Sequence, residues 1–166
     1  MNENFILTVD DIFSKKDCKI LINSYKENLT FEKNNNYSYK DIDVYSFMYL
    51  NKLKEVTEIY TKKYDEINIT ASCWSLNQLR FKLFKKGKSF SSWHSEHTFN
   101  YPYRVLAIQL YLTEHNCGTE FYYNKKTILS KVGRVCIFPA YFTHTHKGQP
   151  DLFKDRMIIT GYYNFF

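Results

Sequence analysis

The apolar positions near the start of the chain follow a helical period. They recur at intervals of three and four residues: Cys18, Leu21, Ile22 and Tyr25. This spacing is typical of one face of an amphipathic helix. Ser14 is suited to cap that helix, and Asp17 three residues later completes a variant of the capping box. We predict a short strand over residues 5–8, followed by a helix that reaches about residue 28.

A second helical pattern covers residues 51–67. Lys and Glu side chains lie opposite an apolar face made of Leu53, Val56, Tyr60 and Ile67. The stretch from Thr30 to Lys40, between the two predicted helices, is polar and rich in Asn. We predict a loop there.

From residue 72 onward the pattern changes to that of strands. Residues Trp74–Phe84 alternate with a period of two, as a half-buried strand does, whereas Val105–Leu112 is almost continuously apolar. Shorter strands are predicted over residues 119–123, 127–129, 134–138 and 155–165. Strands at short spacing after two helices indicate an α+β chain, mostly β, with a β-sandwich or barrel as its body.

Neither an internal repeat nor a linker divides the sequence. We therefore predict a single domain over residues 1–166, a length sufficient for one ordinary core. Residues 1–70 would form a helical support region, and residues 71–166 would form the strand-rich core. The high aromatic content, 19%, also favours a sheet-rich fold, because such side chains suit pleated surfaces.

The chain is basic, with 23 Lys and Arg against 17 Asp and Glu, which gives a formal charge of +6. This charge permits an anionic partner such as nucleic acid. However, the lysines are scattered in pairs and form no block of like charges, so a solvated surface is the simpler interpretation. Nucleic acid is kept as the less favoured partner.

The cysteines and the N-terminus favour a protein of the cytoplasm. The four cysteines form no CxxC pair, and Cys18 and Cys136 lie among apolar residues, as buried thiols do. The first ten residues lack the basic and apolar regions of a signal peptide. No apolar run approaches the ~20 residues of a membrane span. We expect a soluble, cytoplasmic protein.

Two stretches hold most of the side chains that could bind a metal. His94 and Glu96 lie two residues apart, so they share one face of an extended segment. A third ligand could come from His144 or His146. Two histidines and one carboxylate, with open positions, suit non-haem Fe(II). The alternative is that these histidines are surface or hydrogen-bonded residues without a metal.

Arg156 lies ten residues beyond His146, at the start of an apolar strand. A guanidinium on a barrel wall can bind a carboxylate through two parallel hydrogen bonds. The alternative is a surface ion pair with the neighbouring Asp155.

The order of these residues resembles the motif of the Fe(II)/2-oxoglutarate-dependent oxygenases, in particular the prolyl-4-hydroxylase-like branch. The matching positions run over residues 74–164: Gln78, Phe81, Phe84, Gly87, Phe90, Trp93-His94-Ser-Glu96, Gly118-Thr-Glu-Phe121, Phe138-Pro139, His146-Lys-Gly148-Gln-Pro150 and Arg156. The resemblance implies a double-stranded β-helix, a jelly-roll or cupin-like core, supported by N-terminal helices. Each piece is a weak signal alone, and the ordered set is specific.

The resemblance also implies roles for single residues. His94, Glu96 and His146 would hold the iron, which leaves His144 as a neighbour. Arg156 would bind the distal carboxylate of 2-oxoglutarate. The ligand set departs from the commoner pattern in having Glu in place of Asp, and a Glu still supplies a ligand.

Three further residues are candidates for the cosubstrate pocket. Tyr111 is similar in position to a tyrosine with which some relatives contact the same carboxylate; the alternative is a plain core tyrosine. Thr160 and Tyr162 share a face with Arg156 by the period of two.

The activity implied is hydroxylation of a C–H bond with O₂ and 2-oxoglutarate, releasing succinate and CO₂, with ascorbate as an additional candidate cofactor. The expected substrate is a peptidyl residue, of prolyl type, or a free amino acid. Tyr-rich loops over residues 30–50 and 97–103 would form the rim of the site. The alternatives are a nucleic-acid-oxidising member of the same superfamily and a non-catalytic metal-binding jelly roll.

Overall fold

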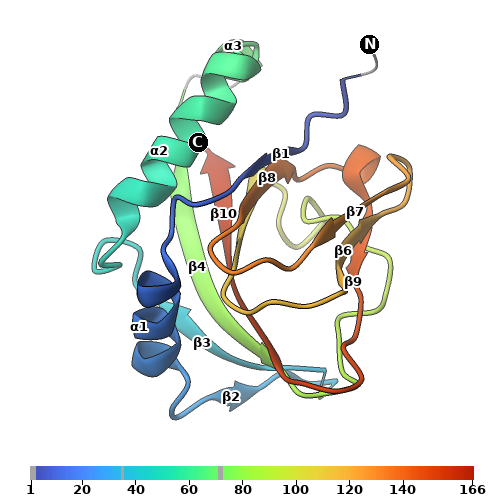
Figure 1. The fold of residues 1–166 in the computed structure, drawn as a ribbon. Helices are drawn as coiled ribbons and strands as arrows, with labels where there is room; N and C mark the ends of the chain where they lie inside the picture. Colours follow the sequence, from blue (N-terminus) through green and yellow to red (C-terminus); the bar gives the residue numbers. More distant parts are fainter. Residues whose placement is uncertain (1–2, 35, 71–72) are drawn as a thin grey trace.

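The structure, a computed structural model, describes residues 3–34, 36–70 and 73–166. Two β-sheets pack face to face, and helices cover the outer face of the larger one (Figure 1). The large sheet has seven strands in the order β1-β8-β5-β10-β4-β3-β2, and the small sheet has three in the order β7-β6-β9. This arrangement confirms the prediction of an α+β chain that is mostly β.

The helices occupy the first half of the chain, and the long strands occupy the second. The helices are α1 (Lys15–Tyr25), α2 (Leu50–Lys63), α3 (Ile67–Thr70) and the 3-10 helix η1 (Phe142–His144). The strands of the large sheet are β1 (Leu7–Val9), β2 (Thr30–Phe31), β3 (Ser38–Ile42), β4 (Trp74–Phe84), β5 (Arg104–Tyr111), β8 (Val135–Pro139) and β10 (Arg156–Phe165). The small sheet contains β6 (Gly118–Phe121), β7 (Lys126–Leu129) and β9 (His146–Gly148).

The C-terminal strand β10 is the centre of the large sheet. It pairs antiparallel with β4 on one side and with β5 on the other. The register places Arg156 opposite Phe84 and Ile158 opposite Lys82. Because side chains alternate between the two faces of a strand, this register decides which residues of β4 and β10 point toward the small sheet.

Each face of the large sheet has its own hydrophobic core. On the outer face, Leu21 of α1 and Val56 of α2 pack with Phe81 and Ile159, all of them buried. On the inner face, between the two sheets, a smaller cluster contains Tyr111, Phe121 and Phe138. The smaller core fills only part of the space between the sheets, and the rest of the inner face carries polar side chains.

The capping box at the start of α1 is confirmed. The backbone N–H of Asp17 donates to Ser14 Oγ at 3.0 Å, and the N–H of Ser14 donates to Asp17 Oδ2 at 2.9 Å. Asp17 also forms an ion pair with Lys52 of α2 at 2.7 Å, which joins the two helices. The predicted end of α1 at about residue 28 was too late, because Lys26 is already the C-cap.

Two other predictions of elements were wrong in part, and one strand was not predicted. Residues 30–40, predicted as a loop, contain β2 and the start of β3, which pair with each other and extend the edge of the sheet beside β4. The helix predicted over residues 51–67 is divided into α2 and α3. The segment after His144 forms β9, a strand of three residues that the sequence analysis did not predict.

All four cysteines are free, and Cys18 and Cys136 are buried as predicted. Burial raises the pKa of the Cys136 thiol to about 12, which keeps it protonated. Among the described residues, no helix combines the length and the apolar character that crossing a membrane requires.

Replacing Ser14 with Ala should lower the free energy of unfolding by about 1 kcal/mol, because the N–H of Asp17 loses its acceptor. Chemical denaturation measures this change. Ser24→Ala is the matched control, since Ser24 Oγ only donates to the carbonyl of Ile20 within the same helix. Equal stability of Ser14→Ala and the wild type would contradict a stabilising role for the cap.

Candidate metal centre and adjoining cavity

The predicted metal ligands come from two segments that pair through their backbones. His94 and Glu96 lie on the loop between β4 and β5, and His146 is the first residue of β9. The N–H of His94 donates to the carbonyl of His146 at 3.0 Å, and the N–H of His146 donates back at 2.9 Å. The loop therefore continues the small sheet by one residue pair.

The same loop is fastened at two more points. The N–H of Gly148 donates to the carbonyl of Phe90 at 2.8 Å, and the N–H of Glu96 donates to the carbonyl of Ala140 at 3.0 Å. Backbone hydrogen bonds therefore hold the loop before, at and after His94. The positions of the ligand side chains follow from this backbone frame.

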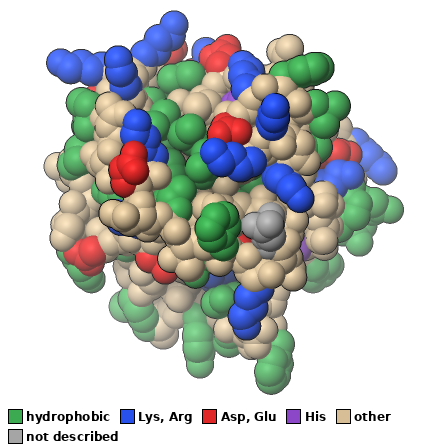
Figure 2. Space-filling view, turned by 90° about the horizontal axis from the view of Figure 1, so that it is seen from below, with side chains coloured by type: hydrophobic (Ala, Val, Ile, Leu, Met, Phe, Trp, Pro, Cys, Tyr) green, Lys and Arg blue, Asp and Glu red, His purple; other side chains and the backbone are tan. Residues whose placement is uncertain are grey.

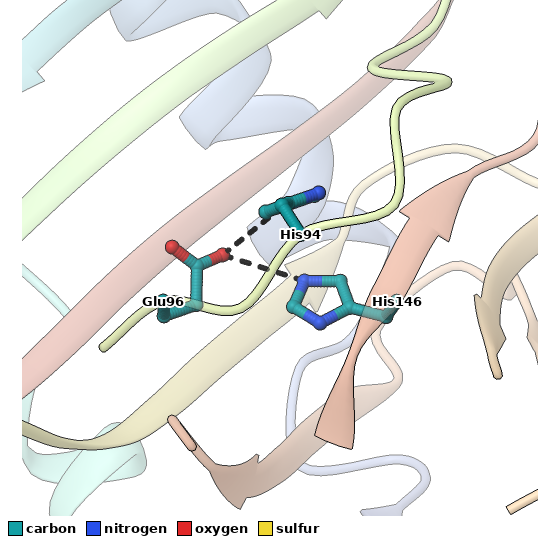
Figure 3. A group of neighbouring side chains, drawn as sticks. All are labelled: His94, Glu96 and His146. Atoms are coloured by element: carbon teal, nitrogen blue, oxygen red, sulfur yellow. Dashed lines mark ion pairs between the residues drawn. The ribbon is translucent and has the colours of Figure 1, made fainter. Parts of the chain in front are cut away.

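The three side chains converge on one point (Figure 3). Glu96 Oε1 lies 3.5 Å from His94 Nε2 and 3.4 Å from His146 Nε2, and the three ligand atoms all lie within 4.8 Å of one another. His94 Nδ1 donates to the carbonyl of Ser92 at 2.8 Å, and His146 Nδ1 donates to that of His144 at 2.9 Å. Because each Nδ1 is bound to a backbone carbonyl, Nε2 is the ring nitrogen that faces the common point and could bind a metal.

Glu96 is held as a carboxylate. Its burial favours the neutral acid, but the imidazoles of His146 and His94 outweigh that effect and hold the pKa of Glu96 well below its usual value. Arg104 Nη1 donates to Glu96 Oε2 at 3.3 Å, on the oxygen that faces away from the histidines. One carboxylate oxygen and two imidazole lone pairs thus form a site that favours a cation.

The other two nearby histidines use their ring nitrogens elsewhere. His144 Nε2 donates to the carbonyl of Asn4 at 2.8 Å, and its Nδ1 is 2.9 Å from the hydroxyl of Thr143. His97 Nδ1 donates to the carbonyl of Arg104 at 3.1 Å. The geometry therefore brings His146 to the site and leaves His144 as its buried neighbour, as the sequence analysis expected.

A cavity of about 300 Å³ opens beside the three converging side chains. Its walls are the inner faces of β4 and β10, the ligand loop, and parts of β5, β6 and β9. Of the tyrosines predicted for the rim, Tyr37 and Tyr101 line it. The side chains of β4 and β10 that line it are Gln78, Arg80, Lys82, Phe84, Arg156, Ile158, Thr160 and Tyr162.

Arg156 lies in this cavity wall rather than in a surface ion pair. Its exposed fraction is 2%, and its Nε and Nη1 have no hydrogen-bond partner among the residues that the structure describes. The guanidinium lies 4.6 Å from the ring centre of Phe84. Asp155, the alternative partner, binds Lys85 at 3.0 Å instead. Burying an unpaired charge costs on the order of several kcal/mol, so Arg156 requires an anion.

Gly148 leaves room for this guanidinium. A Cβ atom at Gly148 would lie 3.0 Å from Arg156 Nη2 and 3.5 Å from the carbonyl oxygen of Phe90. The second distance is ordinary van der Waals contact, whereas the first is so short that the Arg156 side chain would have to shift. The glycine of the predicted His-Lys-Gly sequence is therefore explained by its close approach to Arg156.

The other three predicted pocket residues differ in position. Thr160 and Tyr162 lie in the cavity wall, on the same face of β10 as Arg156. Tyr111 is fully buried behind the wall, and its hydroxyl donates to Thr119 Oγ1 at 2.8 Å. Thr119 in turn donates to Gln109 Oε1 at 3.3 Å, and both of these residues line the cavity.

The sequence analysis missed the polar side chains of β4. Arg80 and Lys82 line the cavity, whereas Phe81 and Leu83, which alternate with them, are buried in the outer core. The only sequence signal for these polar side chains was the period of two that also predicted the strand. It identifies two faces, but it does not tell a face exposed to solvent from a face exposed to a cavity.

A second group of possible ligands is satisfied by hydrogen bonds. His115 and Cys117 lie on the loop between β5 and β6, close to Asp151 near the start of the loop between β9 and β10. His115 Nδ1 is 2.7 Å from Asp151 Oδ2, and its Nε2 is 2.8 Å from Thr113 Oγ1. Both ring nitrogens are used, so this group fastens the loop that leads to Arg156.

Comparisons with known proteins agree with this architecture. No protein-family model and no curated protein matches the sequence. Among solved structures, the chain is similar to the viral collagen prolyl hydroxylase of Paramecium bursaria Chlorella virus-1 in its 2-oxoglutarate complex. The TM-score is 0.79 at 17% identity, over 98% of this chain and 96% of that chain.

The fold is that of the Fe(II)/2-oxoglutarate-dependent oxygenases. A prolyl-4-hydroxylase of Pseudomonas putida matches with a TM-score of 0.74 at 12% identity, over 97% of this chain and 92% of that chain. A prolyl hydroxylase of Trichoplax adhaerens, in complex with a hypoxia-inducible-factor peptide, matches with a TM-score of 0.65 at 12% identity, over 97% and 84%. The predicted double-stranded β-helix with N-terminal supporting helices is confirmed.

The residues present fit the metal and the cosubstrate that the oxygenase fold implies. Two imidazoles and one carboxylate form a donor set suited to Fe(II). The unpaired guanidinium of Arg156 opens on the same cavity and matches a carboxylate. The candidate metal ligands and the candidate carboxylate-binding residue Arg156 therefore line the same cavity.

His146→Ala should abolish binding of a divalent metal, because it removes one of three convergent donors. His144→Ala should retain metal affinity within about threefold, since both nitrogens of His144 are used elsewhere. Titration with Mn²⁺, followed by calorimetry, compares the two variants after circular dichroism has shown that both are folded. Equal loss of affinity in both would contradict the assignment of His146.

Proposed function

We propose that the protein is an Fe(II)- and 2-oxoglutarate-dependent dioxygenase that hydroxylates a C–H bond of a peptidyl residue, of prolyl type, or of a free amino acid. The observation that carries this proposal is the position of Arg156. Its buried guanidinium has unpaired Nε and Nη1 atoms and lines the same cavity as the three candidate ligands. A site that only held a metal would not need a buried cation in its wall.

In this proposal His94, Glu96 and His146 hold the iron. The hydrogen bonds from Nδ1 of the two histidines to backbone carbonyls fix the tautomer of each ring. Arg104 holds the second carboxylate oxygen of Glu96. When bound, Fe(II) supplies the oxidising chemistry with O₂ and 2-oxoglutarate, which leaves as succinate and CO₂. The protein's own contribution is orientation and the exclusion of water.

Arg156 orients the cosubstrate. Its planar fork can bind the distal carboxylate through two hydrogen bonds, and Gly148 allows it the space. Thr160 lies four residues further along the same face of β10, and Tyr111 acts from behind Thr119. Because an anion relieves the cost of the buried charge, the cosubstrate gains affinity from Arg156.

The solved structures support the substrate class without naming the substrate. The viral enzyme is a collagen prolyl hydroxylase, and the Trichoplax enzyme was solved with a peptide. His94, Glu96 and His146, which would hold the metal, border a cavity whose walls are formed in part by Tyr37 and Tyr101. A single residue of a peptide, or a free amino acid, suits a cavity of about 300 Å³ that also holds the cosubstrate.

Arg156→Ala should raise the dissociation constant of 2-oxoglutarate by on the order of 100-fold, because a bidentate charged contact is lost. Metal affinity should stay within about threefold, since Arg156 does not contact the ligands. Calorimetry with the Mn²⁺-loaded protein measures both constants, and succinate formation with Fe(II) gives the matching kinetic result.

Two further variants sharpen this test. Gly148→Ala should also raise the dissociation constant of 2-oxoglutarate, because the added Cβ would lie 3.0 Å from Arg156 Nη2 and displace the guanidinium. Arg134→Ala is the control, because Arg134 is bound to Asp10 on the surface. If wild-type protein binds the metal and yet neither binds nor consumes 2-oxoglutarate, the dioxygenase proposal is wrong and the metal-binding jelly roll is favoured.

A further inference from the structure

Lys82 is a cation of the cavity wall that the proposed mechanism does not use. It lies on the inner face of β4, opposite Ile158 and two residue pairs away from Arg156 along the register. Its Nζ has no hydrogen bond and no ion pair with the described residues. Nζ lies over the ring of Tyr37, whose centre is 5.1 Å away.

The other cations of the cavity have partners. Arg80 binds Asp41 at 2.6 Å, outside the cavity, and Arg104 binds Glu96 at 3.3 Å and Gln78 at 2.9 Å. Arg156 is matched by the distal carboxylate in the proposed function. Lys82 is then the one cation of the cavity wall without an anionic partner among the described residues.

Glu96 does not fill this role. It is the carboxylate whose charge most favours the protonated form of Lys82, while Arg80, Arg104 and Arg156 oppose that form. Burial together with these cations lowers the pKa of Lys82 to about 8. A metal ion bound to Glu96 would offset the negative charge of that carboxylate. In the metal-loaded protein, Glu96 would therefore balance even less of the positive charge of Lys82.

We propose that Lys82 is the anion subsite of the substrate, and that the substrate carries a carboxylate which pairs with Lys82 while its target C–H bond faces the metal. This inference rests on the proposed function and specifies its substrate class. The carboxylate belongs either to an acidic side chain near the target residue of a peptide or to a small free acid.

A carboxylate fits this position better than a nucleic-acid backbone does. Lys82 is a single unmatched charge inside a small cavity, and a monovalent carboxylate matches it. A strand of nucleic acid would need further cations along the approach. On the face shown in Figure 2, the basic side chains are scattered among acidic and hydrophobic ones and form no continuous track.

The test uses the Mn²⁺- and 2-oxoglutarate-loaded protein without oxygen, so that binding is measured without turnover. The probes are acid and amide pairs: N-acetylproline with N-acetylprolinamide, and amidated acetyl-Glu-Pro-Glu with acetyl-Gln-Pro-Gln. A single-stranded oligonucleotide is the phosphodiester probe. The proteins are wild type, Lys82→Met, Lys82→Arg and, as a control, Lys85→Met, which removes an exposed lysine just beyond β4.

Wild type and Lys85→Met should bind the acid of at least one pair about tenfold or more tightly than its amide, as expected for a charge-assisted contact. Lys82→Met should reduce this preference to within about twofold, and Lys82→Arg should keep it. The first pair reports a free acid, and the second reports an acidic side chain. All variants should bind 2-oxoglutarate within about threefold of wild type, because Arg156 holds that anion.

Three results would overturn the inference. The first is equal binding of acid and amide in both pairs by wild type, including no measurable binding of either. The second is a preference that survives Lys82→Met. The third is that Lys82→Met keeps the preference for the acid over the amide but loses binding of 2-oxoglutarate or of the oligonucleotide. Failure of wild type to bind 2-oxoglutarate at all would instead refute the proposed dioxygenase function.

Discussion

The site depends on one pair of backbone hydrogen bonds between His94 and His146. These bonds, 3.0 and 2.9 Å long, join a loop that has little regular structure to the edge of the small sheet. They fix where the two imidazoles leave the backbone, and the Nδ1–H bonds then fix how each ring is turned. The arrangement of Glu96 between the two Nε2 atoms follows from this frame. Side-chain chemistry alone would not hold three donors within 4.8 Å of one another.

The inner face of the large sheet concentrates positive charge in a small volume. Arg80, Lys82, Arg104 and Arg156 all line the cavity, and Glu96 is its one carboxylate among the described residues. A folded protein accepts such an excess only where anions offset it, because buried unpaired charges are costly. Partners on the chain account for Arg80 and Arg104. In our proposals the remaining two cations bind two separate anions: Arg156 the cosubstrate and the partly buried Lys82 the substrate.

The local features of the fold could be predicted from the sequence because short-range patterns determine them. The capping box of α1 and the alternation of β4 depend on neighbouring residues, and both are confirmed. The strands β2 and β3 were missed because their polar residues pair only at the edge of a sheet built from distant segments. β9 was missed because a strand of three residues has no readable period.

The candidate site shows the same division. The spacing of His94, Glu96, His146 and Arg156 could be read from the ordered motif, and the structure brings all four to one cavity. The role of Lys82 could not be read, because alternation does not distinguish a solvent face from a cavity face. Nor could the sequence show that Thr119 lies between Tyr111 and the cavity, since this depends on the packing of the two sheets.

The central claim is that metal and cosubstrate share one site formed by the β9–β10 segment and the loop paired with it. The most direct measurement is the thermodynamic linkage between them, by calorimetric titration of 2-oxoglutarate into the protein with and without Mn²⁺. A shared site predicts that the metal tightens 2-oxoglutarate binding by more than about tenfold, and that 2-oxoglutarate tightens metal binding by the same factor. Independent binding of the two would contradict the account.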